Sequence, residues 1–172
     1  KRLFLLGAKK GKRLPTYPLP TTSRAGDYPL IGTVPGPSCH DALSDLPDAS
    51  RFQTLLLTDE VRTNAWGVPS PYAAELRCTT PSAWRFGYER AWDPGILTSS
   101  ARTDHSDISQ LRFDETPPGE VEPISRFFKL APDGVSNTLR AGTDAARGAF
   151  TSPRPIHYKF PRCVTVREMA RL

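Results

Sequence analysis

Six residues carry side chains that could perform nucleophilic or metal chemistry, namely three cysteines and three histidines. Cys39 adjoins His40, and a thiol beside an imidazole could form an activated nucleophile. Sequence neighbours in an irregular segment rarely have the geometry for such catalysis, so we do not expect this pair to act. The remaining four are scattered, without the HExxH or CxxC spacing of a metal site: Cys78, His105, His157 and Cys163. We therefore expect reduced thiols, no disulfide framework and no metal site.

Nucleotide chemistry also lacks a local signature. The chain has no GxGxxG motif and no phosphate-binding loop. The segment "RAGTDAARGAF", residues 140–150, has two glycines but not the spacing of a nucleotide site. Any cofactor loop would have to lie outside this sequence.

Charge is distributed unevenly along the chain. Residues 1–24 carry seven basic side chains and no acid, whereas residues 25–139 carry sixteen acidic and nine basic side chains. Residues 140–172 are basic again, with seven Lys or Arg and two acids. Basic segments that meet in space would suit a polyanion such as nucleic acid. The alternative is that these side chains merely solvate loops.

One basic segment, residues 138–154, has a composition that suits contact with DNA. Arg140, Arg147 and Arg154 stand there among Gly142, Gly148 and other small residues. Small residues let a backbone approach a duplex, while arginine can reach phosphates or a guanine edge. We expect Arg140 and Arg147 to contact DNA.

The two ends of the sequence begin elements that they do not complete. Residues 3–6, "LFLL", are a continuous apolar run that predicts a strand buried on both faces of a parallel sheet, or alternatively an edge strand. Thr165 and Glu168 have capping-box spacing, and Val164 and Met169 have the spacing of a hydrophobic staple. A helix that starts there and ends at residue 172 is marginal alone. We expect both ends to lack partners, as in a segment of a larger α/β protein.

The elements between the ends are short. Residues 39–46 predict a helix with Ala42, Leu43 and Leu46 on one face, and residues 103–113 a helix capped by Asp104 or Ser106. Residues 123–130 alternate weakly, as in a strand, and "PDG" at 132–134 predicts a turn. With 18 prolines in 172 residues the chain should be loop-rich. No stretch is long and apolar enough to span a membrane, and we expect a cytoplasmic protein.

Three motifs, in order, resemble those of bacterial DNA (cytosine-5) methyltransferases. "KRLFLLGAKKGKRLPTYPLPTT" resembles the segment after the Gln-x-Arg-x-Arg motif, with Arg2 as its last Arg, and "DALSDLP" resembles the segment that follows. "NTLRAG" supplies the Thr–Leu pair of the target recognition domain, Thr138 and Leu139. "PRCVTVREMARL" resembles the late Arg-x-Leu-Thr-x-Arg-Glu-x-Ala-Arg-Leu motif, with Val164 in place of Leu. The positions in register are Arg162, Thr165, Arg167, Glu168, Ala170 and Arg171.

The resemblance implies an α/β fold: a fragment of a Rossmann-like S-adenosylmethionine-dependent methyltransferase domain plus a loop-rich, mixed α+β target recognition domain. Residues 1–24 would be the terminal strand and exit loop of the catalytic domain, 25–150 the target recognition region, and 151–172 the start of the return to the catalytic domain. The cofactor, S-adenosylmethionine, would bind outside this segment. So would the Pro-Cys nucleophile, because none of the three cysteines follows a proline.

The whole enzyme would flip a cytosine out of double-stranded DNA and methylate its C5 atom. The resemblance gives Arg2 the role of binding the flipped base and ordering the catalytic carboxylate. Thr138, Leu139 and Arg140 would contact DNA beside that base. Arg162, Thr165, Arg167 and Glu168 would organise the recognition domain. This segment alone should be inactive, because its partner is the missing catalytic half; the alternative is a non-catalytic specificity subunit of a split methyltransferase.

Overall fold

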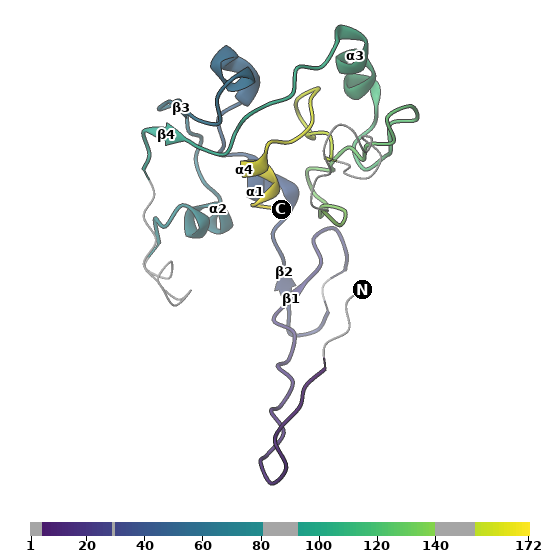
Figure 1. Cartoon of the computed structure of the whole chain (residues 1–172). Helices are drawn as coiled ribbons and strands as arrows, with labels where there is room; N and C mark the ends of the chain where they lie inside the picture. The colour runs from purple at the N-terminus through teal and green to yellow at the C-terminus, as the bar shows by residue number, and fades with distance from the viewer. Residues whose placement is uncertain (1–4, 29, 81–92, 140–153) are drawn as a thin grey trace.

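The computed structural model of the chain describes residues 5–28, 30–80, 93–139 and 154–172. Figure 1 shows an extended arm, made of residues 5–28 and 30–37, that reaches away from a loop-rich body. The narrow end of the arm turns at Lys9–Lys12, where the Lys12 N–H donates to the Lys9 carbonyl at 2.9 Å. Strand β1 (Thr22–Ser23) pairs in parallel with β2 (Val34–Pro35), nearer the body.

The predicted strand at residues 3–6 is wrong where the structure describes it. Leu5 and Leu6 are 87% and 46% exposed, and neither belongs to a strand. No described strand lies beside them, so their backbone groups have no ladder to join. The first half of the run, residues 3 and 4, lies outside the described residues.

Helix α1 (Cys39–Leu43) occupies the centre of the body, and its local sequence explains why it forms. The Ser38 hydroxyl accepts from the Asp41 N–H, and the Asp41 carboxylate accepts from the Ser38 N–H, which completes a capping box. Ala42 and Leu43 are buried, as the predicted apolar face requires. The helix expected over 39–46 is confirmed, with an end three residues earlier than predicted.

The rest of the body consists of short elements joined by loops. Antiparallel strands β3 and β4 form the second two-stranded sheet, and α3 begins at its predicted cap, Ser106. The bounds are η1 Ala49–Arg51, η2 Gln53–Leu56, β3 Val61–Arg62, α2 Pro71–Leu76, β4 Ile96–Leu97, α3 Asp107–Glu115 and α4 Val166–Met169. The described part is a small, loop-rich, mixed α/β arrangement. Its sheets have only two strands each, so the Rossmann-like assignment stays a prediction.

The predicted strand over 123–130 does not form as a regular element. The Arg126 N–H donates to the Glu122 carbonyl, and the left-handed φ of 59° at Arg126 breaks the extension. Only isolated bridges follow, from Val121 to Phe128 and from Lys129 to Ile156. The turn predicted at 132–134 is confirmed, because the Gly134 N–H donates to the Ala131 carbonyl at 3.2 Å.

The carboxyl-terminal segment packs into the body, contrary to the expectation that it lacks partners. Val164 is buried in one cluster with Leu43 and Leu130, and Met169 packs against this cluster. Helix α4 begins with the predicted capping box of Thr165 and Glu168. Figure 1 shows α4 beside α1, although the two are far apart in sequence. The helix is therefore stabilised by tertiary packing rather than by its own length.

Candidate nucleic-acid interface and its buried ionic core

A buried ion pair occupies the base of the carboxyl-terminal segment. Arg162 Nη1 and Nη2 donate to the two carboxylate oxygens of Glu168 at 2.8 and 2.7 Å. The side chains are only 5% and 4% exposed. Two parallel bonds between a planar guanidinium and a carboxylate fix both distance and orientation. This geometry defines the path of the chain from residue 162 to residue 168.

The Glu168 carboxylate also caps α4, and its partner Arg162 contacts the distant η1. Glu168 Oε2 accepts the Thr165 N–H at 2.7 Å, while Thr165 Oγ1 accepts the Glu168 N–H at 3.3 Å. Arg162 Nε donates to Ser50 Oγ at 3.1 Å and lies 3.6 Å from Asp48 Oδ1. One guanidinium therefore joins segments more than 100 residues apart.

The ionisation of these groups follows from their contacts. Burial alone would raise the pKa of Glu168, but the hydrogen bonds and charge of Arg162 outweigh it and lower that pKa. Burial likewise opposes the charged form of Arg162, yet Glu168 raises its pKa. His157, whose Nε2 lies 3.9 Å from Glu168, has its pKa lowered to about 4, mainly by burial. The pair is therefore ionised at neutral pH beside a neutral imidazole.

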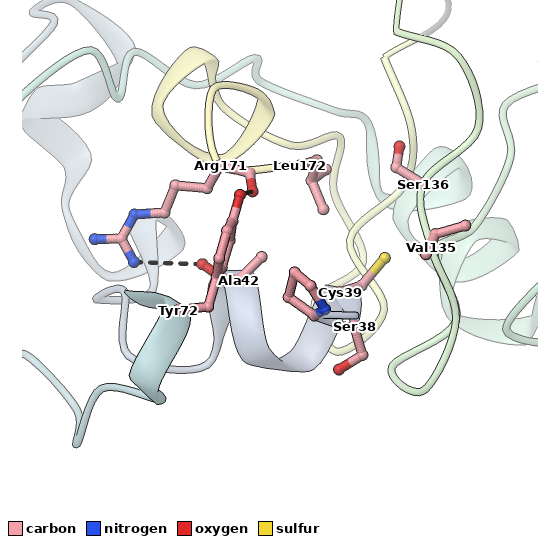
Figure 2. Close-up of a pocket in the computed structure, with 9 residues that line it drawn as sticks. Ser38, Cys39, Ala42, Tyr72, Val135, Ser136, Arg171 and Leu172 are labelled. Atoms are coloured by element: carbon pink, nitrogen blue, oxygen red, sulfur yellow. Dashed lines mark hydrogen bonds between the residues drawn. The ribbon is translucent and has the colours of Figure 1, made fainter. Parts of the chain in front are cut away.

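A second ionic group surrounds Asp45, whose side chain is fully buried. Arg77 Nη1 lies 3.1 Å from Asp45 Oδ2, and Arg171 Nη1 lies 2.5 Å from Oδ1. Arg171 also donates to the Ala42 carbonyl at 3.3 Å, a contact drawn in Figure 2, while the Tyr72 hydroxyl donates to the Arg171 carbonyl at 3.0 Å. These contacts tie the end of α4 to α1 and α2.

Arg167 is engaged on another side of α4. Its Nε donates to the Thr98 carbonyl at 3.1 Å, its Nη2 donates to the Thr98 hydroxyl, and its backbone N–H donates to Ser99. Thus Arg162, Arg167 and Arg171 each anchor α4 to a different part of the body. Arg162 and Arg171 are buried, whereas Arg167 is half-buried and lines a surface cleft with Trp66 and Thr98.

The residues predicted to contact DNA directly are only partly described. Thr138 is exposed and Leu139 is half-buried, in the segment that follows the turn at 132–134. Arg2, Arg140 and Arg147 lie outside the described residues. Their assignment to catalysis and DNA contact therefore stays a proposal.

The cysteines are free, and two of them are unsuited to nucleophilic chemistry. Burial raises the pKa of the Cys39 thiol to about 11 and that of Cys163 to about 12. His40 is exposed, and its Nδ1 lies 3.4 Å from the Tyr158 hydroxyl. Burial therefore favours the protonated thiol of Cys39, which is a poor nucleophile.

Figure 2 shows a small cavity between α1, α2 and the end of the chain. Its volume is about 40 Å³, which admits a few waters but no organic ligand. A cleft of about 370 Å³ lies beside Arg162, and we call it the Arg102 cleft. It is lined by Ser50, Gln53, Leu56, Arg102, Thr103, Asp104, His105, Gln110, Pro161 and Arg162.

Sequence reasoning did not identify Asp45 or the Arg102 cleft as parts of a site. For Asp45 the sequence contained a usable sign, because this carboxylate stands between Leu43 and Leu46, two positions of the predicted apolar face. Arg102 had none, because the cleft combines residues from three distant segments. Within the described ranges no three metal-ligating side chains cluster, and no helix is long and apolar enough to cross a membrane.

Comparison with known proteins places this geometry in context. No family model matches the chain. All 172 residues align, at 50% identity, with the Type II methyltransferase M.XorII of Xanthomonas oryzae pv. oryzae (strain KACC10331 / KXO85). The whole chain resembles part of a type II methyltransferase. It spans 37% of that relative's length.

A solved structure gives the same result for the fold. It is described as a DNA modification methyltransferase encoded within a prophage, from E. coli, and shares 27% identity with a TM-score of 0.52. The match covers 80% of this chain and 36% of that one. Sequence and fold therefore agree that this chain is similar to roughly one third of a methyltransferase.

Proposed function

We propose that this chain is the target-recognising part of a DNA (cytosine-5) methyltransferase. The observation that carries the proposal is the Thr165–Glu168 capping box with its buried Arg162 partner, in a chain 50% identical throughout to a type II methyltransferase. Arg162, Thr165 and Glu168 are buried and hydrogen-bonded within the fold, which supports a role in holding the recognition region together. Thr138, Leu139, Arg140 and Arg147 are proposed to contact duplex DNA.

The proposal places the S-adenosylmethionine loop outside this sequence, which has no GxGxxG motif. A cofactor loop needs glycines that leave room for a ligand beside the backbone. Gly36 and Gly67 each lie between a strand and a helix, but an added Cβ would come within 3.0 Å of the Ser23 carbonyl oxygen and 3.1 Å of the Asp45 Cα, respectively. Both glycines are thus required by packing of the chain itself. The proposal accordingly places the cofactor and the nucleophile in the remainder of the enzyme.

The chain by itself should bind duplex DNA and transfer no methyl group. Incubation with duplex DNA and labelled S-adenosylmethionine measures transfer, with a denatured sample as the background. Methyl incorporation above that background would contradict the proposal that the nucleophile and the cofactor loop lie outside this chain. Failure to bind any duplex at low salt would contradict the role in recognition.

The direct contacts can be tested by removing single arginines. Arg140→Ala and Arg147→Ala should each weaken DNA binding in a salt titration on cognate and scrambled duplexes. A phosphate contact should weaken binding to both duplexes and reduce the salt slope by about one, whereas a base contact should cost about 1–3 kcal/mol on the cognate duplex alone. Thr138→Ala should cost about 1 kcal/mol, as for one neutral hydrogen bond. Arginine variants that match the wild type on both duplexes would refute the assignment.

A non-catalytic specificity subunit of a split methyltransferase would have the same recognition role. The two alternatives differ in whether the catalytic portion is covalently attached. Sequencing the DNA that flanks this coding segment distinguishes them. A continuous upstream frame that encodes a Pro-Cys nucleophile supports the single-chain enzyme, and a separate start codon beside Lys1 supports the subunit.

A further inference from the structure

The Arg102 cleft holds a guanidinium in a fixed orientation at its wall. Arg102 Nη2 donates to Gln53 Oε1 at 3.0 Å, and its Nε lies 3.4 Å from the Phe52 carbonyl oxygen that accepts from it. Arg102 is half-buried, and its Nη1 makes no hydrogen bond to any described residue. The Arg102 guanidinium is therefore held through Nε and Nη2, which leaves the donors of Nη1 for another partner.

The cleft is also lined by neutral hydrogen-bonding groups. His105 Nε2 accepts the Cys163 N–H at 3.3 Å, which in a neutral imidazole leaves the proton on Nδ1. Burial lowers the pKa of His105, so the neutral form predominates at pH 7. Gln110 Nε2 donates to the His105 carbonyl at 2.8 Å, which leaves its amide oxygen as an acceptor. The cleft lining therefore offers both hydrogen-bond donors and acceptors.

The charged groups of the cleft lining are Arg102, Arg162 and Asp104. Arg162 lines the base of the cleft, but Glu168 neutralises it through two hydrogen bonds. Asp104 contributes a carboxylate that would repel an anion. Arg102 is the arginine of the cleft lining whose Nη1 makes no hydrogen bond to a described residue. With a volume of about 370 Å³, the cleft is wide enough to admit the exposed edge of a base.

We propose that the Arg102 cleft receives the edge of a guanine in duplex DNA, with Arg102 donating to guanine O6 and N7 and Gln53 holding the guanidinium in place. Arginine presented as a fork is the side chain that best matches this pair of acceptors. The proposal rests on the function proposed above and adds a specificity-determining residue to it. Arg102 and Arg162 line the same cleft. The proposed base contact would therefore lie beside the buried ion pair of Arg162 and Glu168.

The test selects preferred duplexes for the purified chain from a pool with a randomised region, by binding and sequencing. The wild type should enrich guanine at one position at least. Arg102→Lys, which keeps the charge but loses the fork, and Arg102→Ala should each lower the preference for that guanine by about 5- to 150-fold. Gln53→Ala should reduce it less. Arg51→Ala is the matched control, because Arg51 is exposed nearby and lies outside the cleft lining.

Replacing the selected guanine with 7-deazaguanine removes the N7 acceptor and gives an independent measurement. It should weaken binding of the wild type and leave binding of Arg102→Ala unchanged. Binding with unaltered base preference in both folded Arg102 variants would overturn this proposal and leave the recognition function standing. Absence of any duplex binding by the wild type would overturn both.

Discussion

Replacement of Glu168 by alanine should cost the fold about 3–5 kcal/mol. The substitution removes both acceptors of Arg162 and leaves that guanidinium, 5% exposed, without its bidentate partner. It also leaves the Thr165 N–H without its capping acceptor. Together these losses would be a large fraction of the 5–15 kcal/mol that typically stabilises a domain.

Urea unfolding, followed by tryptophan fluorescence and circular dichroism, measures the change. Glu168→Gln should cost less, because an amide oxygen still accepts one bond from Arg162. The double variant Arg162→Met/Glu168→Leu should be more stable than Glu168→Ala, since no charge is left buried without a partner. Glu115→Ala, at an exposed position, is the control and should change stability by less than about 0.5 kcal/mol. A loss below about 1 kcal/mol for Glu168→Ala would refute the account of the ionic core.

Three further predictions concern single groups. The pKa of His157 is lowered to about 4, so the fold favours its neutral form. The free energy of unfolding should therefore fall by up to about 3 kcal/mol as the pH drops from 6.5 to 4. Urea unfolding of His157→Gln over this pH range should show a smaller pH dependence. Thr165→Ala should cost about 1 kcal/mol in urea unfolding, and Thr165→Ser almost nothing. Iodoacetamide, followed by mass spectrometry, should label half-buried Cys78 well before Cys39 or Cys163, whose pKa values are raised by burial; the reverse order would contradict the structure.

Local sequence predicted α1, α3 and α4 because their start signals are local, but α2 was not predicted, although Ser70 caps it and Pro71 begins it. Ser106 caps α3, and the Thr165–Glu168 box caps α4, with partners three residues away in both cases. The weak alternation of residues 123–130 failed as a strand signal because a turn at Arg126 overrides it. A two-residue periodicity over eight residues cannot reveal such a turn.

The candidate site was less predictable because its contacts join distant residues. Asp45 and Arg171 are 126 positions apart, and Arg102 meets Gln53 across 49 positions. The same motif arginines would have carried the same charge on an open surface, and only the fold shows that Arg162 and Arg171 are buried. The family resemblance gave their motif but not their partners.

The contact between Asp45 and Arg171 joins the segment after α1 to the residues that follow α4. It closes a loop of 126 positions. For a flexible loop, doubling its length adds only about 0.6 kcal/mol of closure entropy. Surface loops between Asp45 and Arg171 can therefore lengthen or shorten between related chains at little cost in closure entropy, as long as these two residues are kept. The contact between Asp45 and Arg171 would then keep its geometry while the loops between them change in length.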